Sequence, residues 1–221
     1  MLEVSLNEIE SLALKSARGS GFDWGLAEET ARAARWLAAR NLPWARSLAA
    51  LLEANAAERL GGFIWTGSDV VANTADLDSC PIRGGVCLCD FVRVLPRLVL
   101  PRILQPLWLL PFADTASNLI GAPIGLRWSE GSMVVGPNGT ASVDAHSMLH
   151  LSIVSRTDLT MEMETAEASI LPLEGWARGA AGRTVRESDW RRLQHFAHLT
   201  YVPASETSRL TGAGAGIIDN E

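Results

Sequence analysis

Three cysteines lie close together near the middle of the chain, where they could hold a metal ion or attack a substrate. Cys80, Cys87 and Cys89 follow the spacing Cys-x6-Cys-x-Cys. Structural zinc sites favour closely spaced cysteine pairs, so this pattern predicts no metal site. Two alternatives stay open. One is a nucleophilic thiol with a pKa lowered by Arg83 and nearby backbone amides, and the other is a set of small core residues.

The motif Arg83-Gly84-Gly85 is a candidate anion site. Glycines let backbone N–H groups approach a ligand closely, and a guanidinium can hold a carboxylate with two hydrogen bonds. Asp90 follows shortly after and belongs to the same candidate site. The alternative is a tight glycine turn next to a surface arginine. The cofactor, if any, is not identified by this or any other motif.

Further candidates come from the two ends of the chain. Lys15 is the only lysine and Tyr201 the only tyrosine. Ser205, Ser208 and Arg209 follow Tyr201 and precede a run of alternating glycines, which could form a nest of backbone N–H groups around an anion. The alternatives are a solvated lysine and a mobile glycine-rich end.

The four histidines do not form a recognisable site. His146 and His150 would lie on one face only in a helix, and their segment is predicted as a strand. His195 and His198 fall on a predicted helix, and acid–base catalysis there needs carboxylate partners that the sequence does not place.

These candidates are carried by an N-terminal set of helices. Ser5 and Glu8 have capping-box spacing, and Gly19 is placed as the left-handed stop of the first helix. Asp23 is the predicted cap of a second helix, and Pro43 lies in the first turn of a third.

An apolar stretch at residues 94–112 contains prolines at a regular spacing of five. Prolines and two arginines exclude a membrane-spanning helix, and this proline spacing argues against a central strand. We interpret the stretch as an oligomer interface centred on Trp108, or as a buried connector. The prolines are Pro96, Pro101, Pro106 and Pro111.

The second half of the chain is predicted to be rich in strands. Pro137–Gly139 is a strong hairpin signal between two short apolar runs. A late helix, with Ser188 as its cap, follows a glycine-rich loop. The expected strands are residues 124–128, 132–136, 140–144, 148–156 and 162–171.

The expected fold is therefore α+β, with an N-terminal three-helix segment packed against a mostly antiparallel sheet and a late C-terminal helix. We expect a single domain over residues 1–221. It would consist of a helical part at 1–62 and a mixed part at 63–221 that ends in the glycine-rich tail 211–221.

Composition limits the classes of function. The 221 residues include 48% hydrophobic and 20% charged residues, which argues against a disordered chain. The net charge is -6 without a basic run, so nucleic acid is not expected as a partner. The start of the chain lacks a signal sequence, and we expect a cytoplasmic protein without a membrane partner.

Three segments resemble a bacterial family catalogued only as a domain of unknown function. They are the opening helices, PIRGGVCLCD at residues 81–90 and the closing TYVPASETSRLTGAGAGIIDNE at 200–221. The opening VSLNEIESLALKSARGSG is also similar to the N-terminus of the type 2 malate/L-lactate dehydrogenase family, whose members reduce small keto or imino acids with a nicotinamide cofactor. That family continues with a functional histidine, whereas this chain has NLPWARSLAALL.

Two functions are compatible with these observations. The first is an enzyme or enzyme subunit of small-molecule catabolism that binds a carboxylate-bearing metabolite. Its site would be built from Arg83, the glycines after it and the residues after Tyr201. The second is a non-catalytic accessory or assembly subunit that docks through residues 94–112. In either case a homo- or hetero-oligomer is expected.

Overall fold

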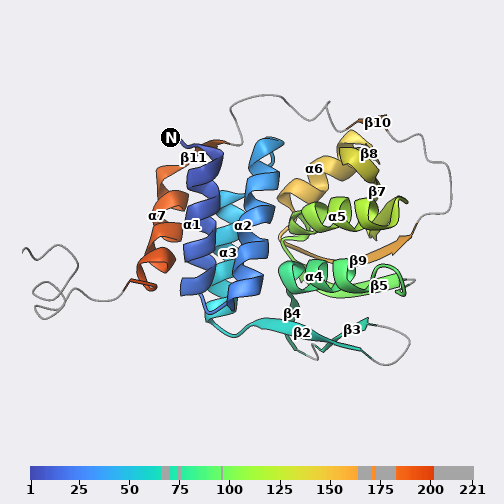
Figure 1. Cartoon of the computed structure of the whole chain (residues 1–221), viewed down its shortest axis with the longest axis horizontal. Helices are drawn as coiled ribbons and strands as arrows, with labels where there is room; N and C mark the ends of the chain where they lie inside the picture. The colour runs from blue at the N-terminus through green and yellow to red at the C-terminus, as the bar shows by residue number, and fades with distance from the viewer. Residues whose placement is uncertain (66–69, 74–75, 96, 164–170, 173–182, 202–221) are drawn as a thin grey trace, which may run out of the picture.

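A bundle of helices and a large sheet with its own helices lie side by side in the computed structural model (Figure 1). The structure describes residues 1–65, 70–73, 76–95, 97–163, 171–172 and 183–201. The bundle, on the left in Figure 1, consists of α1 (Leu6–Gly19), α2 (Trp24–Ala39), α3 (Ala45–Ala56) and α7 (Glu187–His198). The expected α+β class is confirmed.

The first two helices begin where the sequence predicts, whereas Pro43 lies before the third helix and not in its first turn. The Ser5 hydroxyl accepts a bond from the Glu8 N–H at 3.2 Å, and the Glu8 carboxylate accepts one from the Ser5 N–H at 2.7 Å. Asp23 caps the second helix by accepting a bond from the Leu26 N–H at 2.8 Å. These caps satisfy N–H groups that the helices cannot satisfy themselves. The helices are α1 (Leu6–Gly19), α2 (Trp24–Ala39) and α3 (Ala45–Ala56).

The C-terminal helix α7 (Glu187–His198) completes the bundle by packing against α1 and α3. A short antiparallel pairing of β1 (Leu2–Glu3) with β11 (Thr184–Val185) leads into it. The predicted cap Ser188 is wrong, because the helix begins one residue earlier and Arg186 occupies the cap position. The bundle is thus assembled from both ends of the chain.

Gly19 does not stop α1 in the predicted way. It is the last residue of the helix, and the left-handed position is taken by Gly21, with φ of 99°. Gly19 lies instead against α7, where a Cβ atom would stand 1.8 Å from the carbonyl oxygen of Phe196. The glycine is therefore required by a close helix–helix approach, which the local sequence does not reveal.

The described part of the large sheet has the strand order β10-β8-β7-β6-β9-β5-β3-β2-β4. The first three strands of the predicted meander are confirmed, since β6, β7 and β8 pair antiparallel in sequence and Pro137–Gly139 joins the last two. Strands β2, β3 and β4 extend the sheet with both parallel and antiparallel pairings. The strands are β2 (Leu60–Trp65), β3 (Val70–Asn73), β4 (Asp78–Ser79), β5 (Arg97–Leu104), β6 (Ile124–Trp128), β7 (Gly131–Gly136), β8 (Thr140–Val143), β9 (Arg156–Met163) and β10 (Leu171–Pro172).

A helix replaces one predicted strand. Residues 148–156 were expected in the sheet, but α6 occupies Ala145–Ile153 and β9 begins only at Arg156. Asp144 starts this helix by accepting a bond from the Ser147 N–H at 2.8 Å. Two further helices are α4 (Pro81–Phe91) and α5 (Leu110–Ile120).

The proline-rich segment forms core rather than an interface. Strand β5 contains Pro101 and lies between β9 and β3, so the argument against a central strand is wrong. A bulge between Leu100 and Ile103 accommodates the proline, because residues in a bulge need no ladder hydrogen bond. Trp108 is fully buried, which contradicts an oligomer surface centred on it.

Tryptophan side chains connect the bundle to the sheet half. The Trp36 indole N–H donates to Asp114 at 2.7 Å, and the Arg40 guanidinium lies 3.8 Å from the Trp36 ring centre. The Trp108 indole N–H donates to the Ser47 hydroxyl at 2.9 Å. No helix in the described ranges has the length and hydropathy needed to cross a membrane.

Candidate functional site

Arg83 cross-links the two halves of the molecule. Its guanidinium donates to the Asn55 side chain at 3.2 Å and lies 5.2 Å from the ring centre of Phe22. Asn55 in turn donates to the Ser20 carbonyl at 2.9 Å. Arg83 lines an open hollow of about 400 Å³, but its contacts are those of a structural residue.

The two glycines after Arg83 do not form an anion site. Both are buried inside α4, and the Gly84 N–H already donates to the Cys80 carbonyl at 2.9 Å. A Cβ on Gly85 would stand 2.2 Å from the Phe112 ring, so this glycine lets α4 and α5 pack closely. Asp90 is exposed and lies seven residues after Arg83, about 10 Å further along the helix. The packing of α4 therefore gives no support to a joint Arg83–Asp90 site, which stays a prediction.

The cysteines behave as core residues. Burial raises the pKa of the Cys80 thiol, and burial together with the nearby Asp90 charge raises the pKa of Cys87 to about 11. Burial is also the main cause that raises the pKa of Cys89 to about 12. A nucleophilic thiol needs a lowered pKa, so that alternative is contradicted. Across the described ranges, no three His, Cys, Asp or Glu side chains are grouped as a metal site.

The raised pKa values of the three thiols predict that the cysteines are alkylated slowly in the native protein. With a pKa of about 11, roughly one Cys87 thiol in a thousand is ionised at pH 8. We expect iodoacetamide to label the native protein at least about 100-fold more slowly than the urea-unfolded chain at that pH. Mass spectrometry of peptides at timed intervals measures the rate for each cysteine. One cysteine reacting as fast in the native protein as in urea would contradict the burial argument.

The structure brings together two candidates from opposite ends of the chain. The Lys15 ammonium lies 5.7 Å from the ring centre of Tyr201, and His198 packs edge-on against the same ring at 5.3 Å. They line an open groove of about 430 Å³ between α1 and α7. The other tail candidates, Ser205, Ser208 and Arg209, lie outside the described residues.

Two of the remaining histidines, His150 and His195, have structural partners. His150 lies on a helix, contrary to prediction, and its Nδ1 accepts a bond from the Trp128 indole at 3.1 Å. Its Nε2 lies 3.6 Å from the Glu130 carboxylate. His195 packs against the neighbouring Phe196 ring. His146 is exposed at the start of the same helix as His150.

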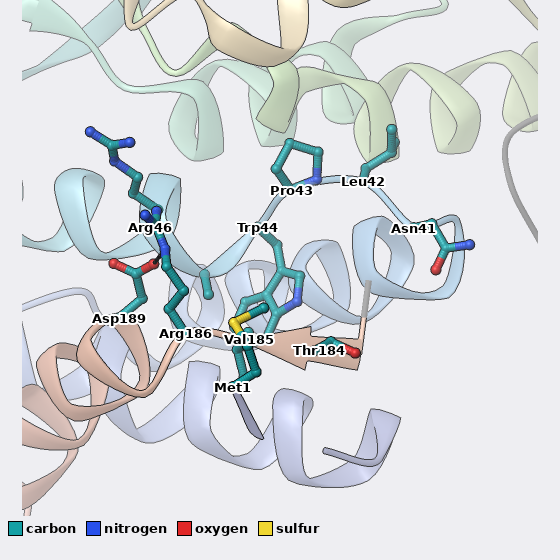
Figure 2. Close-up of a pocket in the computed structure, with 11 residues that line it drawn as sticks. Met1, Asn41, Leu42, Pro43, Trp44, Arg46, Thr184, Val185, Arg186 and Asp189 are labelled. Carbon is teal, nitrogen blue, oxygen red and sulfur yellow. Dashed lines mark hydrogen bonds and ion pairs between the residues drawn. The ribbon is translucent and has the colours of Figure 1, made fainter. Parts of the chain in front are cut away.

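Two adjoining cavities, of about 360 and 610 Å³, share the side chains of Pro43, Arg46 and Arg186. We call them together the arginine pocket. The smaller cavity opens between the residues before α3 and those before α7, as Figure 2 shows. The larger cavity continues toward Arg192 and the end of α6. The pocket therefore lies where the bundle meets the sheet half.

Two of the three arginines in the pocket are held by acids. Arg186 Nε donates to Asp189 at 3.0 Å, and Arg192 Nη1 donates to the other oxygen of Asp189 at 3.5 Å. Arg192 also donates to Glu53 at 2.7 and 3.0 Å. Asp189 is buried, so this network fixes the positions of Arg186 and Arg192.

The third arginine, Arg46, differs from the other two. Among the described residues its guanidinium has no hydrogen bond and no ion pair. Figure 2 shows the Arg46 side chain extending away from Asp189, whereas the Arg186 side chain lies against Asp189. Three arginines and one carboxylate, that of Asp189, line the two cavities, so the lining side chains carry a formal charge of +2. Glu53, which pairs with Arg192, lies outside the lining.

Helix ends add to this positive potential. The cap positions of α3 and α7 are Trp44 and Arg186, and neither caps its helix with a side-chain hydrogen bond. The first N–H groups of both helices thus lie at the pocket without a hydrogen bond from a capping side chain. The N-terminal end of a helix also carries a partial positive charge. The arrangement can bind and orient an anion.

Sequence reasoning did not find this pocket. Arg46 stands in NLPWARSL, which signals only the start of a helix, and Glu53 and Arg192 are 139 residues apart. Arginines next to predicted helix starts were the one available signal. That signal does not indicate that two helices meet.

Residues 4–81 match the family model described as "Protein of unknown function (DUF3726)". The match confirms, for that part of the chain, the predicted relation to a family of unknown function, and it includes Arg46. No curated protein and no solved structure matches the chain. The resemblance to type 2 malate/L-lactate dehydrogenases thus has no support from these comparisons.

Proposed function

We propose that this protein binds a carboxylate-bearing metabolite in the arginine pocket, as an enzyme or enzyme subunit of small-molecule catabolism. The observation that carries the proposal is the Arg46 guanidinium, which lines both cavities and has no partner among the residues that the structure describes. A guanidinium presents parallel N–H donors that match the two oxygens of a carboxylate.

Charge and size support this ligand class. The excess of positive charge in the lining favours an anion, and the Arg46 guanidinium can hold one carboxylate with two hydrogen bonds. The larger cavity, of about 610 Å³, falls within the range of roughly 300–1,000 Å³ that is usual for small-molecule sites.

A second function, that of a non-catalytic accessory subunit, is favoured by one observation. Leu149 and Ile153 on α6 are 62% and 71% exposed, and Ile153 reaches the rim of the arginine pocket. Exposed apolar side chains that lie together are typical of a surface that contacts another protein. Titration with small carboxylates separates the two candidate functions, since an accessory subunit that binds no metabolite shows no carboxylate binding that depends on Arg46.

The test is a calorimetric titration with small monocarboxylates and their neutral amides. We expect carboxylates to bind and Arg46→Met to weaken them at least about tenfold, because a hydrogen bond to a charged group contributes about 1.5–3 kcal/mol. Methionine keeps the length of the side chain and the helix propensity of α3.

The matched control is Arg191→Met, which removes an exposed arginine of α7 whose partner is Glu187. Its affinity for carboxylates should equal that of the unsubstituted protein. Equal binding of acids and amides, or unchanged affinity in Arg46→Met, would contradict the proposed function.

A further inference from the structure

The sheet half lines the larger cavity with three polar, uncharged side chains and with the apolar Ile153. The polar side chains are Gln105, which follows β5, and Ser152 and Ser155 around the end of α6. These residues come from the sheet half, whereas the arginines come from the bundle. A ligand that fills the cavity therefore meets charge on one side and neutral hydrogen-bonding groups on the other.

Two of these side chains have free hydrogen-bonding capacity. Within the described ranges, the Gln105 amide and the Ser155 hydroxyl have no side-chain partner, although their backbones are joined by a bond of 2.8 Å from the Gln105 N–H to the Ser155 carbonyl. This bond holds the two side chains next to each other at the cavity. An amide and a hydroxyl each donate and accept, which is the pattern that a ligand hydroxyl requires.

The other two serines differ in what they can offer. Ser152 donates to the Met148 carbonyl at 2.8 Å, so its oxygen stays free to accept a bond. Ser47 donates to the Trp44 carbonyl and accepts from the Trp108 indole, so its hydroxyl is already engaged. The free groups thus cluster around Gln105, away from the bundle.

We infer that the metabolite is a polyhydroxylated carboxylate of the sugar-acid type, with its carboxylate at Arg46 and its hydroxyls toward Gln105, Ser152 and Ser155. This inference rests on the proposed function. A ligand without hydroxyls would leave these polar groups unpaired and shielded from water, which lowers affinity. The smaller cavity, with Leu42, Trp44 and Val185, would instead suit an apolar chain, so the two cavities make opposite predictions for ligand choice.

The test compares three six-carbon probes by calorimetry with the full chain. Gluconate carries a carboxylate and hydroxyls, hexanoate carries only the carboxylate, and sorbitol carries only hydroxyls. We expect gluconate to bind about tenfold or more tightly than hexanoate, since it adds several hydrogen bonds. The variant Arg46→Met should lose binding of both acids.

A double variant tests whether Gln105 and Ser155 cause the preference for gluconate over hexanoate. Ser155→Ala removes a hydroxyl without a side-chain partner, and Gln105→Gly suits the positive φ of 53° at this position. Together they should weaken gluconate about tenfold and leave hexanoate unchanged. The control Ser132→Ala removes an exposed serine of β7, away from the pocket, and should change neither affinity.

The outcomes separate this inference from the proposed function. Hexanoate that binds as tightly as gluconate, with both lost in Arg46→Met, would overturn hydroxyl recognition and keep carboxylate binding. Sorbitol that matches gluconate, with no effect of Arg46→Met, would overturn the proposed function and keep hydroxyl recognition. No binding of any of the three probes would overturn both.

Discussion

Replacing Gly19 with alanine should lower the free energy of unfolding by about 3 kcal/mol, the upper end of the usual cost of overpacking a core. The added Cβ would stand 1.8 Å from the Phe196 carbonyl oxygen and 2.7 Å from its carbon. Both atoms belong to the backbone of α7, so no rotamer change removes the clash. Helix propensity favours alanine by only about 1 kcal/mol. The clash therefore decides the sign, and α7 must move away from α1.

Urea denaturation followed by circular dichroism measures this effect. Gly62→Ala is the matched control, because a Cβ there meets no atom within 4 Å. It should stay within about 0.5 kcal/mol of the unsubstituted protein. If Gly19→Ala were as stable as the control, the described approach of α1 and α7 would be wrong.

Gly19 also shows where sequence reasoning stops. The residue type and its place near a helix end predicted a left-handed stop, because local signals cannot show a helix that lies almost 180 residues away in the chain. The capping residues Ser5 and Asp23 were predicted correctly because their partners lie three residues further on. Local hydrogen bonds leave a readable pattern in the sequence.

The predictions for Pro101 and for the segment around His150 are wrong for related reasons. Proline predicts against a central strand, but β5 bulges at this point and the Pro101 carbonyl accepts a hydrogen bond from the Ser79 hydroxyl at 2.6 Å. Near His150, the apolar run fits a strand or a short helix equally well, and the cap at Asp144 decides for the helix. Both outcomes depend on what packs around the segment.

The candidate site was the least predictable part. The adjacent residues Arg83, Gly84 and Gly85 predicted an anion site. In the structure the two glycines instead let α4 pack closely against its neighbours. The arginine pocket joins residues from α3, α7 and the end of β5, which are neighbours only after the bundle meets the sheet. Lys15 and Tyr201 show that single unusual residues can still point to a groove.

Replacing Asp78 with alanine should lower the free energy of unfolding by about 3 kcal/mol, because it removes a buried carboxylate that binds two arginines. Its side chain is 8% exposed, and Arg102 donates to one oxygen at 3.1 and 3.2 Å. Arg156 donates to the other oxygen at 2.5 Å. Asp78 thereby joins β4 to the bulge in β5 and to the start of β9.

The loss should stay below that of a fully buried pair, because water can solvate both guanidiniums once the carboxylate is gone. Arg102 and Arg156 are 51% and 47% exposed. The control is Glu162→Gln, which weakens an exposed pair with Arg127 on the same sheet and should cost less than about 1 kcal/mol. Thermal and urea unfolding of both variants measure the difference. Equal stabilities would mean that the contacts of Asp78 are worth no more than those of a surface ion pair, and that the bulge at Pro101 holds its shape without them.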